Sequence, residues 1–222
     1  MKISKETIDL LKNFSTINPS VYVESGSLIQ TTSPYGNVFA FADVDEFFDT
    51  PFGIYELSRF LNIISMMPDP EFNFSDKSVE ISSGKHSVKY QYADKSMIIH
   101  QKVDPANVTS FSGSLNFTMT KNDVVVLRKA AALLDMPEAQ FECTDGKVIV
   151  RAIDLDNGTI DDWTTVITTT DQEDSGPITF SFDSLKLMDG DYDVYLDPNS
   201  SFGVFKGKQI PVTYAVSVRG DV

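Results

Sequence analysis

The sequence of 222 residues contains a single cysteine and no long hydrophobic run. Cys143 has no partner for an internal disulfide, which is typical of proteins in a reducing compartment. A membrane-spanning helix needs about 20 consecutive apolar residues, and none of the apolar runs approaches this length. Residues Met1–Lys5 also lack the apolar segment of a secretory signal. We therefore expect a cytosolic protein without a membrane partner.

Positive charge is scarce as well. Eighteen Lys and Arg residues against 32 Asp and Glu residues give a net charge of −14. Such a surface repels nucleic acid at long range, so any nucleic-acid contact must be local. A hydrophobic content of 41%, with 16 Phe and 8 Tyr, excludes a disordered chain and favours β-rich packing. The length predicts two domains of ordinary size.

Motifs for catalysis or metal binding are missing. Two histidines, His86 and His100, cannot form a zinc site or a Cys–His nucleophile with one cysteine. No Gly-rich phosphate loop, Gly-x-Ser-x-Gly elbow or His-Glu-x-x-His sequence is found. The acidic stretch Asp154–Gly158 has its glycine one position too early for a calcium loop, and Asn157-Gly158 is typical of a hairpin turn. We therefore expect no catalytic residue, no metal and no cofactor.

An amphipathic helix is predicted at the amino terminus, ending before Pro19. Its apolar stripe consists of Ile3, Thr7, Leu10, Phe14 and Ile17. The opposite face carries Lys5, Asp9, Lys12 and Thr16. Both lysines are thus expected on one exposed face.

A similar helix is predicted from Lys121 to Leu134, with Thr120 as its N-cap and Asp123 three residues later. Thr120 lies 116 positions after Ser4, and the same shift places Lys5 on Lys121 and Lys12 on Arg128. Lys129 lies at the edge of this polar face. The cap, the apolar stripe and both basic positions therefore recur, which indicates an internal duplication.

The rest of each half repeats the same order of elements. In the first half we expect a meander of strands, then a helix over residues 52–67 with Arg59 on its polar face, then three strands over residues 71–93. In the second half we expect strands from residue 115, a hairpin around Asp145-Gly146, a short helix over residues 183–188 with Lys186, and three closing strands. The predicted boundaries are domain 1 at residues 1–101, a linker at 102–113 and domain 2 at 114–222.

Several segments resemble a known family, the sliding clamps of T-even-type phages, which are processivity factors of the replicative DNA polymerase. The amino-terminal segments Lys2–Thr7, Leu10–Phe14 and Thr16–Asn18 are closely similar. Ile54–Leu57 with Phe60, Leu61 and Ile63 is similar to the family's second helix, and Gly190-Asp191-Tyr192 to the turn after its fourth. Length, acidity and duplicated organisation agree with this family over the whole chain.

The resemblance implies an α+β fold of two similar clamp domains, each with antiparallel sheets outside and two helices inside. Three chains would close head to tail into a homotrimeric ring around duplex DNA. Weak, sequence-independent phosphate contacts would suffice in such a ring. The expected DNA-facing residues are Lys5, Lys12, Arg59, Lys121, Arg128, Lys129 and Lys186. The same faces also carry Asp9, Glu56 and Asp183.

The resemblance also implies partners in the host-cell cytoplasm during infection. An ATP-driven clamp loader would open the ring. DNA polymerase, and in this family a late-transcription sigma-type factor and its co-activator, would insert hydrophobic tails into a pocket near the linker. For this pocket we expect Val103, Pro105, Val108, Val216 and Val218, although ordinary packing of the linker and the last strand would explain the same residues.

Two other functions are compatible with the residues alone. A structural β-rich virion protein would have the same basic helix faces, which would then be merely solvated. An enzyme with an unrecognised carboxylate pair is the third alternative, because so many acidic residues must include neighbours. The sliding clamp is the main hypothesis, and it predicts a protein that tethers its partners and catalyses nothing.

Overall fold

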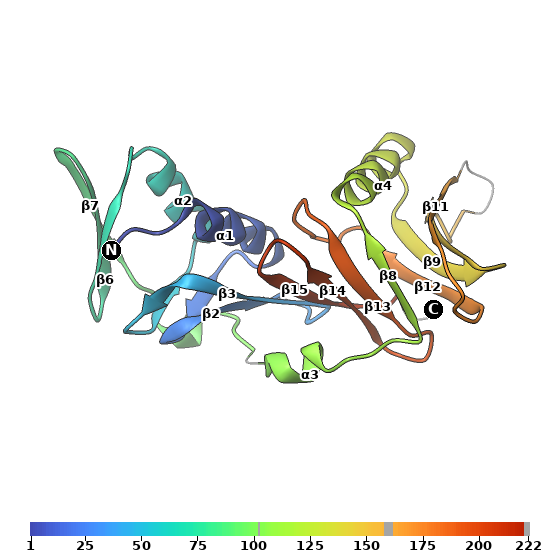
Figure 1. Ribbon diagram of the computed structural model, residues 1–222. Coiled ribbons are helices and arrows are strands. Elements are labelled where there is room, and N and C mark those ends of the chain that lie inside the picture. Colours follow the sequence, from blue (N-terminus) through green and yellow to red (C-terminus); the bar gives the residue numbers. More distant parts are fainter. Residues whose placement is uncertain (102, 158–161, 220–222) are drawn as a thin grey trace. The chain divides into compact units, whose positions relative to one another are not determined.

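The computed structural model describes residues 1–101, 103–157 and 162–219. The chain divides between Val103 and Asp104 into two units (Figure 1). The segment expected as a linker contains a short helix, α3 (Pro105–Thr109), that its sequence pattern did not predict. Asp104 caps this helix by accepting a hydrogen bond from the Ala106 N–H at 2.9 Å, and proline suits its first position.

The first unit contains two helices that pack against each other, α1 (Lys5–Ile17) and α2 (Leu57–Ser65), and a 3₁₀ turn, η1 (Lys95–Met97). Its strands are β1 (Val21–Val23), β2 (Gly26–Thr32), β3 (Val38–Phe48), β4 (Phe52–Ile54), β5 (Glu71–Phe74), β6 (Ser78–Ser83) and β7 (His86–Gln91). Strand β2 pairs with β3, and β5, β6 and β7 pair in that order, all antiparallel.

Two expectations for the first unit were wrong in detail. Strand β1 pairs with β4 and not with its neighbour in sequence, so the expected meander is interrupted. Residues 52–54 form this strand β4, and the helix expected from residue 52 begins only at Leu57. The Gly53 carbonyl in this strand accepts the Ala93 N–H. Glycine suits the position, because a Cβ there would lie only 2.6 Å from the Ile98 side chain.

Helix α1 forms over most of the predicted stretch, but it begins only at Lys5, so Ile3 of the expected apolar stripe lies before the helix. The Ser4 side chain accepts the Thr7 N–H, and Asn18 caps the other end, where its N–H bonds to the Phe14 carbonyl. Its apolar side is buried against β2, β3 and α2 (Figure 1). The buried residues are Thr7, Leu10, Leu11, Phe14 and Ile17. The opposite, lysine-bearing side therefore faces away from the core of the unit.

The buried side chain of Glu46 on β3 holds the start of α1. Its carboxylate accepts the Ser4 N–H at 2.5 Å and the Thr7 hydroxyl at 2.6 Å. Burial alone would raise the pKa of Glu46, but the hydrogen bonds from Ser4 and Thr7 outweigh it and lower the pKa below its usual value. The ionised carboxylate thus compensates the positive end of the helix dipole.

We expect Glu46→Gln to destabilise the first unit at neutral pH by about 1 kcal/mol or more, because it removes charged hydrogen bonds. A group with a lowered folded-state pKa stabilises the fold above its unfolded-state pKa and loses this contribution as pH falls through the folded value. The difference between Glu46→Gln and wild type in urea unfolding should therefore shrink below about pH 4.5. A difference independent of pH would contradict this role, and Asp45→Asn, at an exposed neighbour, is the control.

The second unit contains one long helix, α4 (Lys121–Leu134), which packs against β10 and β11. Its strands are β8 (Leu115–Met119), β9 (Glu138–Thr144), β10 (Lys147–Ile153), β11 (Trp163–Thr169), β12 (Ser175–Ser181), β13 (Tyr192–Leu196), β14 (Phe202–Gly207) and β15 (Val212–Ser217). Within this unit, β15, β14, β13 and β8 are neighbours in that order, and β11, β10, β9 and β12 form a second antiparallel sheet. Asp145 and Gly146 both have positive φ in the predicted hairpin turn between β9 and β10.

The predicted capping of α4 is confirmed. Thr120 accepts the Asp123 N–H, and the Asp123 carboxylate accepts the Thr120 N–H at 2.8 Å. Asp191 adds a second acceptor by binding the Lys121 N–H at 2.7 Å. This hydrogen bond lowers the pKa of Asp191, and a hydrogen bond from the Gln209 side chain lowers it further by a smaller amount. The start of α4 is therefore held by carboxylates, as is the start of α1.

The internal duplication extends to strand pairing. The pair β1–β4 corresponds to β9–β12, and β5–β6–β7 corresponds to β13–β14–β15. Strand β8 pairs with β13, and the corresponding contact in the first unit is an exchange of two hydrogen bonds between Met1 and Phe72. The α+β class with a repeated unit is thus confirmed by the topology.

One repeated element is missing, because the helix expected over residues 183–188 is wrong. This stretch makes a single turn, in which the Leu185 N–H bonds to the Ser181 carbonyl. Two buried tyrosine hydroxyls form the hydrogen bonds that the Met188 backbone would form in a longer helix. The Tyr214 hydroxyl accepts the Met188 N–H at 3.3 Å, and the Tyr192 hydroxyl donates to the Met188 carbonyl at 2.8 Å. Burial raises the pKa of both hydroxyls, which keeps them protonated.

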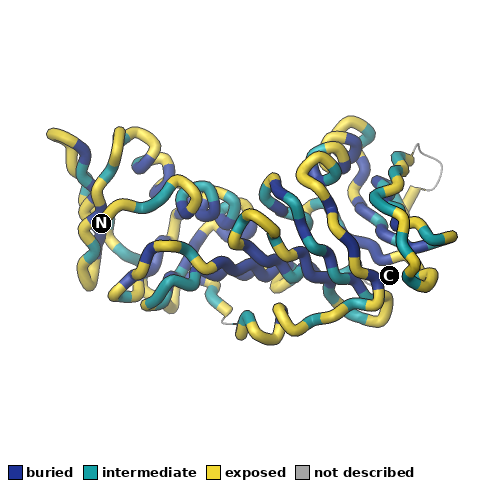
Figure 2. Tube along the Cα trace, in the orientation of Figure 1, coloured by how far each residue is buried: buried dark blue, intermediate teal, exposed yellow. Residues whose placement is uncertain are grey.

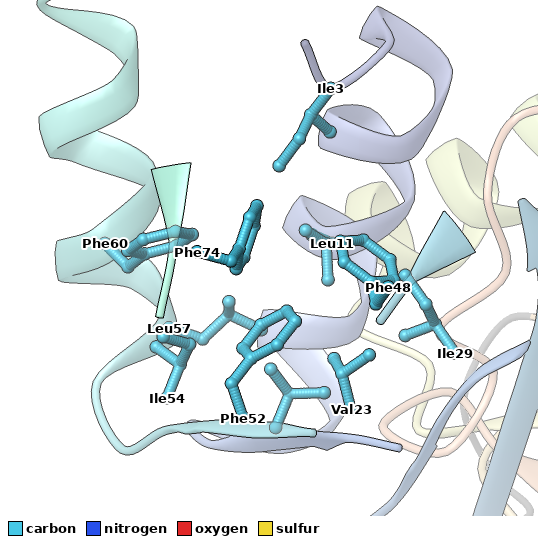
Figure 3. Close-up of a pocket in the computed structure, with 11 residues that line it drawn as sticks. Ile3, Leu11, Val23, Ile29, Phe48, Phe52, Ile54, Leu57, Phe60 and Phe74 are labelled. Atoms are coloured by element: carbon cyan, nitrogen blue, oxygen red, sulfur yellow. The ribbon is translucent and has the colours of Figure 1, made fainter. Parts of the chain in front are cut away.

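Each unit has its own apolar core, seen as the buried inner strands and inward helix sides in Figure 2. In the second unit, Phe141 is fully buried, and its ring centre lies 5.9–6.3 Å from those of Phe117, Phe180 and Phe205. In the first unit, side chains from α1, α2 and the strands surround a small cavity of about 10 Å³ (Figure 3). All of its lining side chains are apolar, so it is a packing defect and not a binding site.

Candidate nucleic-acid interface

Helix α1 places Lys5 and Lys12 on one exposed face. Residues seven apart differ by only about 20° around a helix, so the two lysines lie two turns apart along the same line. Lys12 forms an ion pair with Asp9, one turn before it, at 2.8 Å. Lys5 makes no ion pair with the described residues. The face therefore combines one free and one paired cation.

Helix α2 contributes Arg59, which is exposed on the side opposite Phe60 and Ile64. Its guanidinium forms an ion pair with Glu56 at 3.0 Å, and the hydrogen bond from this contact raises the pKa of Arg59. The first unit thus carries Lys5, Lys12 and Arg59 on the exposed faces of its two packed helices, as the sequence predicted.

Helix α4 carries Lys121, Arg128 and Lys129, all exposed. Lys121 and Arg128 are seven residues apart and share one line, and Lys129 lies beside it. Arg128 binds the Asp189 carboxylate at 2.8 Å and the Leu187 carbonyl at 2.8 Å. Neither Lys121 nor Lys129 makes an ion pair within the described part of the chain.

Lys186 differs from the other six cations in its setting. It follows the turn at residues 182–184 and lies on no helix, and it is half-buried. Its Nζ lies 3.6 Å from the Asp183 carboxylate, which is a looser ion pair than those on the helices. Its expected place on a fourth helix face is therefore wrong, although it stays within the same unit as α4.

This arrangement suits contacts with a polyanion. Lysine and arginine side chains on exposed helix faces can reach phosphate oxygens, and contacts of this kind position a nucleic acid without reading its bases. Sequence reasoning missed the Asp189 partner of Arg128, because the two residues lie far apart in the chain. It also missed Glu46 and Asp191, which fix the starts of the two basic helices. In the sequence they are only two of many acidic residues.

The five residues expected in a partner pocket have different surroundings. Val108 and Val216 are buried, at 5% and 0% exposure, whereas Val103, Pro105 and Val218 are half-buried. Val103 belongs to the first unit and the other four to the second. Val216 contributes to the core of its sheet from β15. The pocket stays a prediction, with its half-buried members as the surface that a partner could reach.

Among residues 1–101, 103–157 and 162–219, no group of three or more His, Cys, Asp or Glu side chains could hold a metal ion. No helix in these ranges combines the length and apolarity needed to cross a membrane. Asp154 uses its carboxylate to accept the N–H groups of Asp156 and Asn157 in a turn. Gly158, the second residue of the expected hairpin turn, lies outside the described residues.

The fold defines a class of protein when compared with solved structures. The chain is similar to A. fulgidus PCNA bound to the C-terminal region of FEN-1, with a TM-score of 0.72 and 16% identity over 98% of this chain and 96% of that one. It is also similar to the Helicobacter pylori beta clamp, with a TM-score of 0.71 and 9% identity over 99% of this chain and 65% of that one. The fold is therefore that of the sliding clamps, as expected.

No protein-family model matches the chain. The curated relatives found by sequence comparison are sliding clamps of phages. The chain is 27% identical to the sliding clamp of Enterobacteria phage T4 and 26% identical to that of Escherichia phage RB69, each over 100% of this chain and 98% of the relative. It is 25% identical to the sliding clamp of Vibrio phage KVP40 over 89% of this chain and 91% of the relative. The resemblance seen at the amino terminus is thus confirmed, and with it the prediction of a non-enzymatic DNA sliding clamp of the phage type. The alternative of a structural virion protein is not favoured.

Proposed function

We propose that three copies of this chain close head to tail into a ring around duplex DNA and tether the replicative polymerase in the host-cell cytoplasm. The observation that carries this proposal is the repeated basic helix: α1 and α4 present cations at matching positions on faces turned away from their cores. A ring holds DNA by topology, so it needs only a weak attraction from these side chains. The expected DNA-facing residues are Lys5, Lys12, Arg59, Lys121, Arg128, Lys129 and Lys186.

Two strand edges support head-to-tail assembly. Among the described residues, β7 pairs only with β6, and β11 pairs only with β10. Open edges of this kind can add a strand from another chain. The β7 edge carries the exposed Lys85 and Lys89, whereas the exposed Asp162 and Asp171 flank β11. The opposite charges favour a contact between the β7 edge of one chain and the β11 edge of the next, which is a heterologous interface. Such an interface forms a ring when the rotation from one chain to the next closes the circle.

We expect Lys85→Glu with Lys89→Glu to weaken assembly by about tenfold or more, because like charges would then meet across the interface. Asp162→Lys with Asp171→Lys should have the same effect, and an equimolar mixture of the two variants should recover part of the assembly through their matched edges. Light scattering measures the mass in each case. Lys206→Glu with Lys208→Glu, the same number of reversals on and directly after β14, a strand paired on both sides, is the control. Monomeric wild type at high concentration would refute the ring.

Partners beyond DNA follow from the same proposal. A separate loader driven by ATP would open the ring, which is consistent with a sequence that has no phosphate loop. Polymerase, and late-transcription sigma-type factor and co-activator, would dock by hydrophobic tails near Val103, Pro105, Val108, Val216 and Val218. The half-buried Val218 is the test position: Val218→Asp should reduce polymerase capture by the assembled ring while leaving its mass unchanged.

A further inference from the structure

The carboxylates beside the basic helix faces form ion pairs with the cations that are expected to face DNA. Lys12 binds Asp9 at 2.8 Å, Arg59 binds Glu56 at 3.0 Å, and Arg128 binds Asp189 at 2.8 Å. Two of these pairs are local, one helical turn apart, and the third joins residues 61 positions apart in the chain. The same kind of pair thus forms on all three helices by different structural routes.

All three pairs are accessible to solvent. The cationic side chains are 49–72% exposed and the carboxylates 39–55% exposed. Exposed ion pairs are worth at most about 1 kcal/mol, so a phosphate can displace the carboxylate readily. In contrast, Lys5, Lys121 and Lys129 make no ion pair with any described residue, although they lie on the same helices.

We propose that Asp9, Glu56 and Asp189 limit the DNA affinity of the basic faces by holding Lys12, Arg59 and Arg128 until a phosphate replaces them. Each such contact exchanges one ion pair for another, so the number of ion pairs changes little as DNA moves past. The free lysines provide the net attraction. The inference rests on the proposed DNA contact and adds residues that tune it.

The test compares two triple variants of the full chain that change the net charge equally. One removes the pairs with Asp9→Asn, Glu56→Gln and Asp189→Asn. The matched control makes the same chemical changes at exposed carboxylates that form no ion pair in the described structure, with Asp43→Asn, Glu173→Gln and Asp145→Asn. Fluorescence anisotropy with a short labelled duplex, over a salt series, gives the affinity and its salt dependence.

We expect the pair-removing variant to bind about tenfold more tightly than the control at low salt. The slope of log K against log salt should also steepen by up to about 0.9 for each cation freed. If the three carboxylates had a purely structural role, their removal would leave this slope unchanged. Equal affinities and equal slopes for the two variants would overturn the proposal, because the carboxylates would then act through net charge alone.

A second comparison uses the cations themselves. Lys5→Gln with Lys129→Gln removes free cations, and Lys12→Gln with Arg128→Gln removes paired ones from the same two helices. The first variant should lose several-fold more affinity, and equal losses would count against the proposal. If neither variant alters DNA binding, the proposed function fails as well, whereas equal and substantial losses contradict only the limiting role of the carboxylates.

Discussion

Reversal of Lys5, Lys12, Lys121 and Arg128 to Glu should abolish processive DNA synthesis. Each chain would change its charge by eight units on the two repeated helix faces, and attraction to phosphate would become repulsion. In a primer-extension assay with polymerase and loader, we expect product length to fall to that of polymerase alone. Because these side chains are exposed and the apolar stripes of α1 and α4 are untouched, the circular dichroism spectrum should stay unchanged.

A second quadruple variant controls for net charge. Lys77, Lys147, Lys206 and Lys208 lie outside the helices, and their reversal to Glu changes the charge by the same amount. We expect this variant to keep most of its processivity. Wild-type processivity in the helix variant would show that the basic faces do not contact DNA. Arg128 also binds the Leu187 carbonyl, so an Arg128→Gln version separates loss of this bond from charge repulsion.

Phe141→Ala should cost the second unit about 3–5 kcal/mol of unfolding free energy. The Phe141 ring is fully buried among Phe117, Phe180 and Phe205. These rings lie on strands from both sheets of the unit, and the paired strands cannot move together to fill the cavity that loss of the Phe141 ring would leave. Such a loss is a large part of the whole unfolding free energy of a typical domain. Denaturant unfolding followed by tyrosine and tryptophan fluorescence measures it.

Two further variants show whether the effect comes from packing. Phe141→Leu retains most of the buried volume and should cost clearly less than Phe141→Ala. Phe47→Ala removes a ring that is 63% exposed and should change stability by less than about 0.5 kcal/mol. A small effect of Phe141→Ala would mean that the core around β9 is loosely packed.

Local features of the fold could be predicted from the sequence because their causes are local. Ser4 and Thr120 cap helices whose apolar residues recur every three to four positions, and Asp145-Gly146 supplies the positive φ angles of a hairpin turn. The repeat was visible for the same reason: equivalent helices need equivalent caps and stripes. The positions of the cations on α1, α2 and α4 followed directly.

Features that depend on distant residues could not be predicted in this way. Strand β1 pairs with β4 because of how the chain packs, and no local pattern in Val21–Val23 distinguishes that partner from β2. Residues 183–188 have an apolar spacing compatible with a helix, but hydroxyls of Tyr192 and Tyr214 satisfy the Met188 backbone instead. The pairing of Arg128 with Asp189 was hidden likewise, whereas the spacing of Asp9 and Lys12 made their contact foreseeable.

In the proposed trimer, the turn at residues 182–184 would set the symmetry of the inner surface. Each chain would contribute one unit with the two packed helices α1 and α2 and one unit in which, among the described residues, α4 is the one helix longer than five residues, so the lining would repeat three times around the axis and not six. B-form DNA repeats about every 10 base pairs, which three-fold spacing does not match. No rotation of the duplex would then align all its phosphates with all the cations at once, and the ring would have no preferred angular position on the DNA.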